Sequence, residues 1–537
     1  MATTTAAGTT HTTRAGTTKT KTTKTTTQPP FLDVFILTFN AGKQAIDPTA
    51  FALHLRDAFA HNATGLPELV VFCLQEMAPL AHSFIGGYMM GPYFQNYASA
   101  VNLAASSYVA RPGQARDGRG AEYEGQDGSQ GRGQDRGQDR GQDRGQDQDQ
   151  GQDQEEEEGG SNRAYTLVTT RSVGMTGIML MARDASALHG LKAAEVSFGA
   201  GNLANKGALG LRVLVSKQDA AGRERHTELT FVGAHLAAHE WNLEKRNKHW
   251  EGIVSGLLFE DPKKLGEIES AHPTPRAASS GDESDSLLSH MPGERALHDI
   301  TIYKPGSHLF VAGDLNYRIS KTPPTSDSHF PDLDAQSPYY FRHFLALDQL
   351  ASEKAAGRTL HGLCEPAILF PPTYKLEVTD GKAAKATRDV VSWQWASHRW
   401  PGWCDRVLYL EIPPWVSRSS SSAAPAAPGL KVKTVAYNAL PPIRTSDHRP
   451  VFLRLGVPVL EPAALSPPHE LSASDSNDPR VRLPYPIDLE SWEHRAQVKR
   501  WEPVIGWSML VSQSAQGITI FVVLLVVGLG TWWLRSR

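Results

Sequence analysis

Cysteine, net charge and long apolar runs are all scarce in this chain of 537 residues. The three cysteines, Cys73, Cys364 and Cys404, are too few and odd in number, so they imply no disulfide framework. We expect each to pack as a small apolar residue in a reducing compartment. The formal net charge of −3 provides no strong field to attract nucleic acid, and no such partner is expected.

Two sequence signals are missing. The basic, threonine-rich start contains neither the apolar stretch that export requires nor the amphipathic pattern of a transit peptide. A glycine-rich phosphate loop of the P-loop kind is also missing. Because nothing upstream directs export, we expect the main folded region to stay in the cytosol.

Four stretches have compositions that cannot supply a hydrophobic core. They are a threonine-rich tail at 1–29, a Gly-Gln-Asp-Arg repeat at 111–160, and smaller insertions at 261–297 and 417–429. We expect all four to be disordered. The remaining roughly 330 residues of regular patterning are enough for one large core, which predicts a single domain over residues 30–457.

One uncharged apolar run lies at 517–534, after a segment at 458–516 that reads as a linker. As a helix the run would rise roughly 27 Å, just enough to cross the hydrocarbon core of a membrane. Trp532 and Trp533 suit the membrane interface. The run therefore predicts a transmembrane tail anchor, with the rest of the chain in the cytosol. Its minimal length favours the thin endoplasmic reticulum membrane, while basic residues on both sides leave the mitochondrial outer membrane open.

The folded part shows two kinds of hydrophobic spacing. Short continuous runs such as 34–39 and 69–74 suit buried strands. Helical spacing occurs in 49–59, 240–258 and 341–354. Strands interrupted by helices predict an α/β fold of packed sheets flanked by helices. Polar motifs follow many of the apolar runs, and strand ends commonly assemble a site from distant residues.

The strongest motif is Gly313-Asp-Leu-Asn-Tyr-Arg318, which follows an apolar run. Asp314 and Asn316 lie two residues apart and share a face at strand period. The carboxylate can take a proton from water while the amide holds a phosphoryl oxygen. A lone Asp-x-Asn fits an Asx turn at a strand end at least as well, so the catalytic interpretation depends on the other motifs.

Glu76 and Asn40 close two apolar runs. A carboxylate at the end of a buried strand is costly unless it is paired or bound to a cation, and a hard divalent ion is a natural partner. A salt bridge for Glu76 and a simple cap role for Asn40 are the alternatives.

Ser446-Asp-His-Arg-Pro450 precedes the last apolar strand, and Asp405 precedes another strand far upstream. Asp405 can accept a proton from His448, which would fix the tautomer of the ring and favour its cationic form. A cationic donor suits the charge that develops on phosphate oxygens. In isolation, the Asp447-His448 pair also fits a solvated turn.

Further cationic or potentially cationic side chains lie in the same motifs. They are Lys206, His235, Lys375, Arg406 and Arg449. Any one of them would ordinarily be a surface charge. Beside the carboxylates, the set indicates a polyanionic ligand with more than one phosphate.

Together the motifs resemble the inositol polyphosphate 5-phosphatases, a branch of the metal-dependent endonuclease/exonuclease/phosphatase superfamily. The segments at 313–318 and 401–408 look like the two signature motifs of that family, and Pro372-Thr-Tyr-Lys375 agrees with it in order and spacing. The resemblance covers about residues 31–457 apart from the insertions. The stretch at 198–207 is longer than the commonest family form. Membership would imply a four-layer α/β/β/α sandwich and dependence on Mg²⁺.

The resemblance also implies a reaction: direct attack of water on the 5-phosphate of phosphatidylinositol 4,5-bisphosphate, by a monomeric, tail-anchored member of the family. The implied catalytic roles are general-base catalysis by Asp314, placement of the phosphoryl group by Asn316, and stabilisation of the transferring group by Asp405, His448 and His235. Metal binding is implied for Glu76, Asn40 and Asp447. Substrate binding is implied for Lys206, Tyr374, Lys375, Arg406 and Arg449, the first four of them at the neighbouring 4-phosphate. A non-catalytic phosphoinositide-binding membrane protein and a nuclease of the same fold are the two alternatives.

Overall fold

The computed structural model describes residues 29–108, 163–199, 203–265, 292–379, 391–418, 430–468, 471–472 and 475–536. The disorder predicted for the N-terminal tail, the Gly-Gln-Asp-Arg repeat and most of the two smaller insertions concerns residues outside these ranges. At residues 292–297 the prediction was wrong, because this end of the insertion at 261–297 forms most of helix α6 (Pro292–Asp299). Part of the long stretch at 198–207 also lies outside them.

Two six-stranded sheets form the centre of the fold. Sheet A runs in the order β13 (Lys433–Ala439), β14 (Val451–Pro458), β1 (Phe31–Asn40), β2 (Leu69–Gln75), β4 (Thr176–Ala182) and β3 (Thr166–Val173). Sheet B runs in the order β5 (Leu188–Phe198), β6 (Lys206–Gln218), β7 (Glu224–His235), β8 (Ser307–Asp314), β12 (Asp405–Leu410) and β9 (Leu363–Cys364). A separate hairpin joins β10 (Leu376–Val378) to β11 (Trp393–Trp395).

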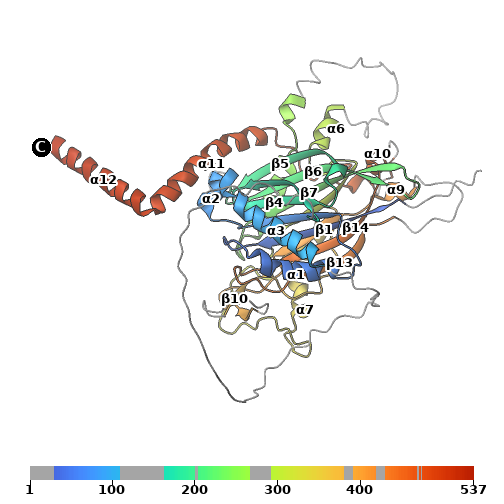
Figure 1. Cartoon of the computed structure of the whole chain (residues 1–537), viewed down its shortest axis with the longest axis horizontal. Helices are drawn as coiled ribbons and strands as arrows, with labels where there is room; N and C mark the ends of the chain where they lie inside the picture. Colours follow the sequence, from blue (N-terminus) through green and yellow to red (C-terminus); the bar gives the residue numbers. More distant parts are fainter. Residues whose placement is uncertain are drawn as a thin grey trace, which may run out of the picture.

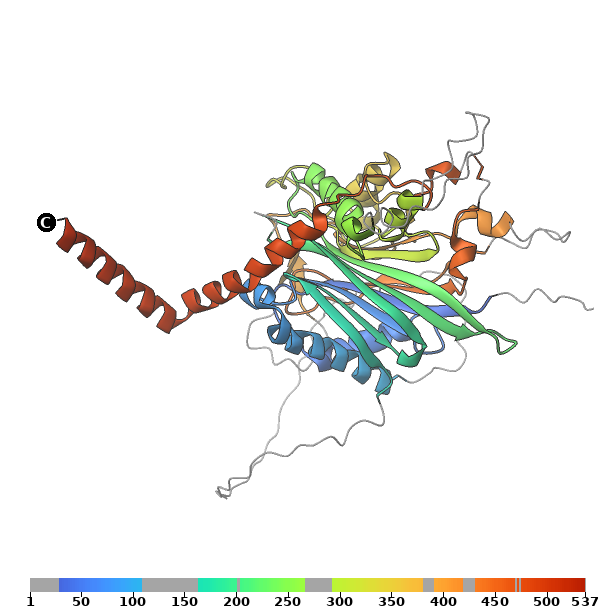
Figure 2. The same cartoon turned by 90° about the horizontal axis from the view of Figure 1, so that it is seen from above.

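Helices cover the outer faces of both sheets (Figures 1 and 2). Sheet A is covered by α1 (Pro48–Ala60) and α3 (Gly91–Ser106), and sheet B by α4 (Leu243–Gly256) and α8 (Gln349–Ala355). The other helices are α2 (Leu80–Ile85), η1 (Gly87–Met89), η2 (Ala185–Ala187), α6 (Pro292–Asp299), α7 (Phe341–Phe344), η4 (Leu345–Leu347), α9 (Pro414–Arg418), α10 (Pro462–Leu465), η5 (Asp475–Asn477), α11 (Ser491–Gln513) and α12 (Ala515–Arg535). The predicted α/β fold with packed sheets is confirmed, and its layers follow the order helices, sheet, sheet, helices.

Three hydrophobic layers follow from the alternation of side chains along each strand. In β1, Val34 and Ile36 face the layer between the sheets, whereas Phe35 and Leu37 face the helices outside sheet A. In β12, Val407 faces the layer between the sheets, and its neighbours face the helices outside sheet B. Strands that bury both faces have continuous apolar sequences, and for this reason the sequence predicts them clearly.

Strand direction gathers the polar ends of several strands at one edge of the sandwich. β1 and β2 are parallel, and so are β7 and β8. In sheet B, Asp314 pairs in register with His235 on one side and with Asp405 on the other. Residues paired in register point to the same face of a sheet. These three side chains therefore share one end of the layer between the sheets.

The folded region extends beyond residue 457. Helix α11 lies within the segment at 458–516 that the sequence predicts as a linker, and it packs against α2 and β5. Figure 2 shows it lying along the side of the sandwich before α12 turns away. The predicted membrane span at 517–534 falls on α12, but among the described residues no helix is both long and apolar enough to cross a membrane. The structure thus gives no support to that span.

The cysteines are free thiols, in agreement with the sequence. Cys73 and Cys404 are buried as expected, but Cys364 is exposed. It lies on β9, a two-residue strand at the edge of sheet B, where one side chain can face solvent.

Candidate active site

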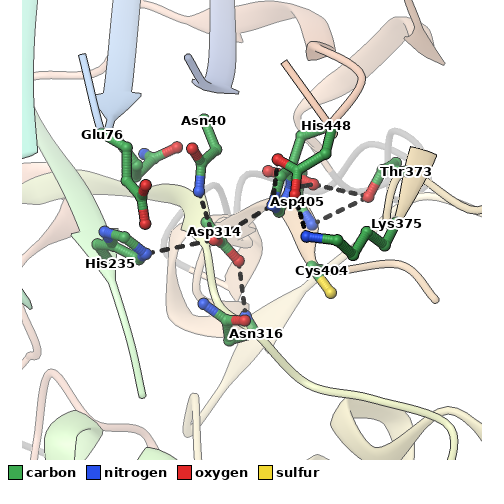
Figure 3. Close-up of polar contacts among 12 residues, drawn as sticks. Asn40, Glu76, His235, Asp314, Asn316, Thr373, Lys375, Cys404, Asp405 and His448 are labelled. Atoms are coloured by element: carbon green, nitrogen blue, oxygen red, sulfur yellow. Dashed lines mark hydrogen bonds and ion pairs between the residues drawn. The ribbon is translucent and has the colours of Figure 1, made fainter. Parts of the chain in front are cut away.

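Asp314 is the centre of a buried polar cluster (Figure 3). Its Oδ2 accepts a hydrogen bond from Asn40 Nδ2 at 3.0 Å, and its Oδ1 accepts one from the backbone N–H of Asn316 at 3.1 Å. The His235 ring lies 3.3 Å from Oδ2. Burial opposes ionisation of Asp314, but the charge of His448 and the hydrogen bond to His235 outweigh it, so the pKa of Asp314 lies below its usual range. The carboxylate stays ionised and fixed by its neighbours.

A second buried pair joins Asp405 and His448. His448 Nδ1 donates to Asp405 Oδ2 at 2.8 Å, as the sequence predicts, and Thr373 Oγ1 donates to the same oxygen at 2.7 Å. Burial disfavours the imidazolium, but Asp405 and Asp314 outweigh it and raise the pKa of His448 to about 9. His448 Nε2 lies 4.0 Å from Asp314 Oδ2. The ring thus presents an N–H toward the space beside Asp314.

Glu76 lies across Asp314 from His448, and Asn40 approaches Asp314 from above in this view (Figure 3). Glu76 is the first residue after β2 and has a φ of 43°, so the chain leaves the strand alternation there. Its carboxylate lies 3.4 Å from Lys43 Nζ and 3.7 Å from Lys206 Nζ. Burial would raise the pKa of Glu76, but the charges of His235 and these lysines lower it on balance.

Lys206 lies at the reacting centre. Its ammonium group contacts the His235 ring as well as the Glu76 carboxylate. Burial lowers the pKa of both Lys206 and His235, and the Lys206 charge further lowers that of His235. The sequence places Lys206 at a neighbouring phosphate; the structure places it beside Asp314.

Asn316 is oriented by two partners. Its Nδ2 donates to the backbone carbonyl of Leu236 at 3.2 Å, and its Oδ1 accepts from the guanidinium of Arg318. Arg318 is buried, and its guanidinium lies 4.2 Å above the ring centre of Tyr374. Sequence reasoning missed Arg318 and Thr373 as parts of the site. Both occur inside motifs that it quoted, so the signal was present but not assigned.

Lys375 and Tyr374 come from the loop before β10. Lys375 Nζ forms an ion pair with Asp447 Oδ2 at 2.6 Å, and the Tyr374 ring centre lies 4.6 Å from that of His448. Asp447, predicted as a metal ligand, lies 3.9 Å from His448 Nε2. The pair places one cation and one carboxylate at the half-exposed rim of the site.

Arg406, predicted to bind substrate, is not brought together with the other predicted site residues in this structure. Its guanidinium binds Asp348 at 3.0 Å and Glu365 at 2.6 Å, and all three side chains are buried. The reason is strand alternation: Asp405 faces the layer between the sheets, so Arg406 must face the outside of sheet B. Arg449 is buried as well, and its guanidinium lies 4.7 Å above the Trp393 ring, where it braces the β10–β11 hairpin.

Two donor sets can be considered for a metal ion. Asp314, Asp405 and His448 offer ligand atoms within 4.8 Å of one another. However, Nδ1 of His448 is bound to Asp405 and the ring favours its cationic form, which has no lone pair for a metal. Glu76 and Asp314 offer carboxylate oxygen atoms only, the chemistry that suits a hard divalent cation. Asn40 directs its Nδ2 at Asp314 Oδ2, and its Oδ1 accepts from the backbone N–H of Gly42 at 3.2 Å, so it holds Asp314 in place. The two carboxylates fit such an ion.

Comparison with known proteins places this geometry in a family. The model of the endonuclease/exonuclease/phosphatase family 2 matches residues 149–454, more than half of the chain. A phosphatidylinositol 3,4,5-trisphosphate 5-phosphatase 2B of Danio rerio is 28% identical over 279 residues, which cover 50% of this chain and 17% of that protein. A type II inositol polyphosphate 5-phosphatase 14 of Arabidopsis thaliana is 28% identical over 267 residues, 49% of this chain and 21% of that protein.

The chain thus spans about a fifth of the length of these curated relatives. Among solved structures, the inositol polyphosphate 5-phosphatase domain of SPsynaptojanin, in complex with inositol (1,4)-bisphosphate and a calcium ion, is 18% identical with a TM-score of 0.44. That match covers 80% of this chain and 84% of the other. On the family match, the chain belongs to the endonuclease/exonuclease/phosphatase family 2.

Proposed function

We propose that this protein is a phosphoinositide 5-phosphatase that hydrolyses the 5-phosphate of phosphatidylinositol 4,5-bisphosphate to give phosphatidylinositol 4-phosphate. The observation that carries the proposal is the buried arrangement of Asp314 between His235 and the Asp405–His448 pair. Similarity to named 5-phosphatases supports the choice of substrate class.

The buried groups divide the chemistry between them. Asp314, held ionised by three hydrogen-bonding neighbours, orients the attacking water and accepts its proton as the new oxygen–phosphorus bond forms. The bond from phosphorus to the inositol 5-oxygen breaks in the same step, and the released oxygen takes a proton from water to leave as the 5-hydroxyl. His448, kept cationic by Asp405, directs Nε2–H at a phosphoryl oxygen whose negative charge grows. Because these groups are buried, their charges act in a medium of low dielectric constant and are stronger than in water.

The proposed cofactor is Mg²⁺. Glu76 would hold it, with Asn40 nearby, and when bound it would neutralise charge on the phosphoryl oxygens. Lys206 adds a second positive charge on the same side of Asp314.

Recognition of the neighbouring 4-phosphate is assigned to Lys375 and Tyr374. Lys375 is half-buried at the rim and is paired with Asp447, so its charge can be shared with an incoming phosphate. Burial lowers the pKa of Lys375, but the Asp447 hydrogen bond and charge raise it on balance, which keeps the side chain cationic. Arg406 has no part in this recognition because it faces away.

The proposed location is the cytosolic face of the endoplasmic reticulum membrane. Its support is the apolar composition of residues 517–534, together with exposed Trp501, Val504 and Trp507 on one side of α11. A fluorescent protein fused to residues 495–537 provides the test. Mitochondrial or diffuse fluorescence would contradict this location without bearing on the chemistry.

The function is tested with a panel of substrates: phosphatidylinositol 4,5-bisphosphate, the 3,4,5-trisphosphate lipid, soluble inositol phosphates and an abasic-site DNA duplex. We expect Mg²⁺-dependent loss of the 5-phosphate and no cleavage of DNA. Asp314→Ala should lower turnover by about 10²–10⁴-fold, the usual contribution of a general base. Lys433→Ala, a change on β13 away from the site, is the matched control.

Three results would refute the proposal: binding of the lipid without phosphate release, cleavage of DNA in its place, or near-normal turnover by folded Asp314→Ala. The first would favour a non-catalytic binder and the second a nuclease of the same fold. Circular dichroism and the midpoint of urea unfolding confirm that each variant is folded.

A further inference from the structure

Helix α11 packs against elements that adjoin two site residues, Glu76 and Lys206. It contacts α2, which follows Glu76 closely in the chain, and β5, whose neighbour β6 begins at Lys206. Figure 1 shows α11 beside α2 and β5 at the edge of the sandwich. The helix lies outside residues 149–454, the part of the chain that matches the family model. Its role must therefore be argued from its contacts.

A buried ion pair on α11 binds the backbone of the Lys206 loop. Arg495 donates to Glu502 through two parallel hydrogen bonds of 2.7 and 2.9 Å. Glu502 Oε1 also accepts from the backbone N–H of Ala204 at 3.2 Å, two residues before Lys206. Arg495 is held in turn by Glu195 on β5 at 3.1 Å. A bidentate arginine–carboxylate pair restricts both side chains, so the acceptor for Ala204 is fixed in place.

The other side of Ala204 is held by the β3–β4 turn. Gly174, with a φ of +50°, lies so close to Ala204 that an added Cβ would be 1.4 Å from its carbonyl oxygen. Ala204 is fully buried between this turn and Glu502. The backbone before Lys206 is therefore clamped from two sides.

Helix α11 also fixes the chain after Glu76. Gly506 approaches α2 so closely that an added Cβ would lie 2.8 Å from the carbonyl oxygen of Ala81 and 2.8 Å from the backbone nitrogen of Ile85. Backbone-to-backbone packing of this kind leaves α2 little freedom to shift. Glu76 and Lys206, which lie 3.7 Å apart at the site, are thus supported by the same helix.

We propose that α11 is a positioning element of the active site and that Glu502, oriented by Arg495, is a positioning residue that sets Lys206 through the Ala204 backbone. The assignment rests on the proposed function for its kinetic readout alone. A displacement of about 1 Å at a reacting centre can cost about 10²-fold in rate, so a contact outside the site can control turnover.

The main test compares Glu502→Ala with a matched control in the full-length protein. Asp475→Ala is the control, because Asp475 is also a buried carboxylate that binds a backbone N–H and an arginine. It accepts from the backbone N–H of Ser472 at 3.1 Å and from the guanidinium of Arg418 at 2.6 Å. Arg418 is in α9, beyond the end of β12 that is opposite to the active site. With soluble inositol trisphosphate as substrate, we expect Glu502→Ala to lower kcat about 10-fold with KM changed less than twofold, and Asp475→Ala to leave both unchanged.

Two further readouts separate positioning from a merely structural role. Glu502→Gln keeps an oxygen acceptor for Ala204 and should recover most of the lost kcat. In a double-mutant cycle, Glu502→Ala should add little to the defect of Lys206→Met, because both changes act on one group. Additive effects in the cycle would overturn the proposal, as would a kcat loss in Asp475→Ala equal to that in Glu502→Ala.

Hydrogen exchange provides a readout that needs no substrate. Peptides that cover residues 203–206 should exchange faster in Glu502→Ala than in the unchanged protein, and Asp475→Ala should leave them protected. Equal protection in all three proteins would contradict the clamp. If the unchanged protein shows no turnover but this exchange difference holds, the proposed function fails while the clamp on the loop stands.

Discussion

Replacing Arg406 by alanine separates a buried ion-pair role from a role in substrate binding. The guanidinium binds Asp348 with contacts of 3.0 and 3.1 Å and Glu365 with contacts of 2.7 and 2.6 Å. The side chains of Arg406, Asp348 and Glu365 are only 3%, 3% and 8% exposed. Removal of the arginine would leave two buried carboxylates without their ion-pair partner, with Lys354 as a nearby cation. Breaking a buried pair in this way costs about 3–5 kcal/mol.

The measurement is the free energy of unfolding in urea, with kinetics recorded on the folded protein. We expect Arg406→Ala to lose about 3–5 kcal/mol of stability while KM for the phosphoinositide stays within twofold. Arg406→Lys keeps the charge but cannot form two bidentate contacts, so its free energy of unfolding should lie between those of Arg406→Ala and the unchanged protein. The triple variant Arg406→Met, Asp348→Asn, Glu365→Gln removes every charge of the cluster and should recover most of the loss, because the penalty comes from unpaired charge.

A variant within about 1 kcal/mol of the unchanged protein but with a strongly raised KM would refute this reasoning and restore Arg406 as a substrate contact.

Three further outcomes follow from the site and its supports. Burial opposes protonation of His448, but Asp405 outweighs it and raises the pKa of His448 to about 9, so the imidazolium is fully present below pH 6.5 and is lost as pH rises through about 9. We therefore expect kcat/KM to fall on the alkaline side of the pH profile, and a flat profile from pH 7 to 10 would exclude the cationic role. EDTA should abolish turnover and added Mg²⁺ should restore it. Glu76→Gln should raise the Mg²⁺ concentration needed for half-maximal turnover, and an unchanged Mg²⁺ titration would remove Glu76 from the ligand set. Gly174→Ala should cost about 1–3 kcal/mol of unfolding free energy, because its Cβ would overlap the Ala204 carbonyl; an unchanged urea midpoint would show that the turn can move freely.

Much of the site could be predicted from sequence because its residues end strands whose apolar runs are unmistakable. Asp314 follows a run that buries both faces, and the same holds for Asn40, Glu76 and His235. The Asp405–His448 hydrogen bond was likewise predicted from two distant motifs. Two predicted helices formed with shifted ends: the pattern at 49–59 gave α1 and the pattern at 240–258 gave α4 from Leu243 to Gly256. The pattern at 341–354 did not give one helix, because the chain there divides into α7, η4 and α8.

The positions of Arg406 and Lys206 relative to the site were not predicted, because they depend on which face of a strand is buried and on which strands pair. Whether Arg406 points into the site is decided by which face of β12 closes the layer between the sheets, and neighbouring residues on a strand face opposite ways. Lys206 was assigned to a neighbouring phosphate, but pairing of β6 with β7 brings it against His235.

The sequence by itself determined the strands, their polar ends and the chemistry those ends can perform, because burial on both faces and the pairing of acid with base are written in local residue patterns. Only the tertiary structure decided which cations reach Asp314 and that α11 packs on the site. Residue 502 meets residue 204 across nearly three hundred positions through one hydrogen bond, and Arg495 orients Glu502 there through a bidentate ion pair. A local pattern carries no information about such a partner, because a glutamate and an arginine seven residues apart on a helix look the same in solvent as they do when buried.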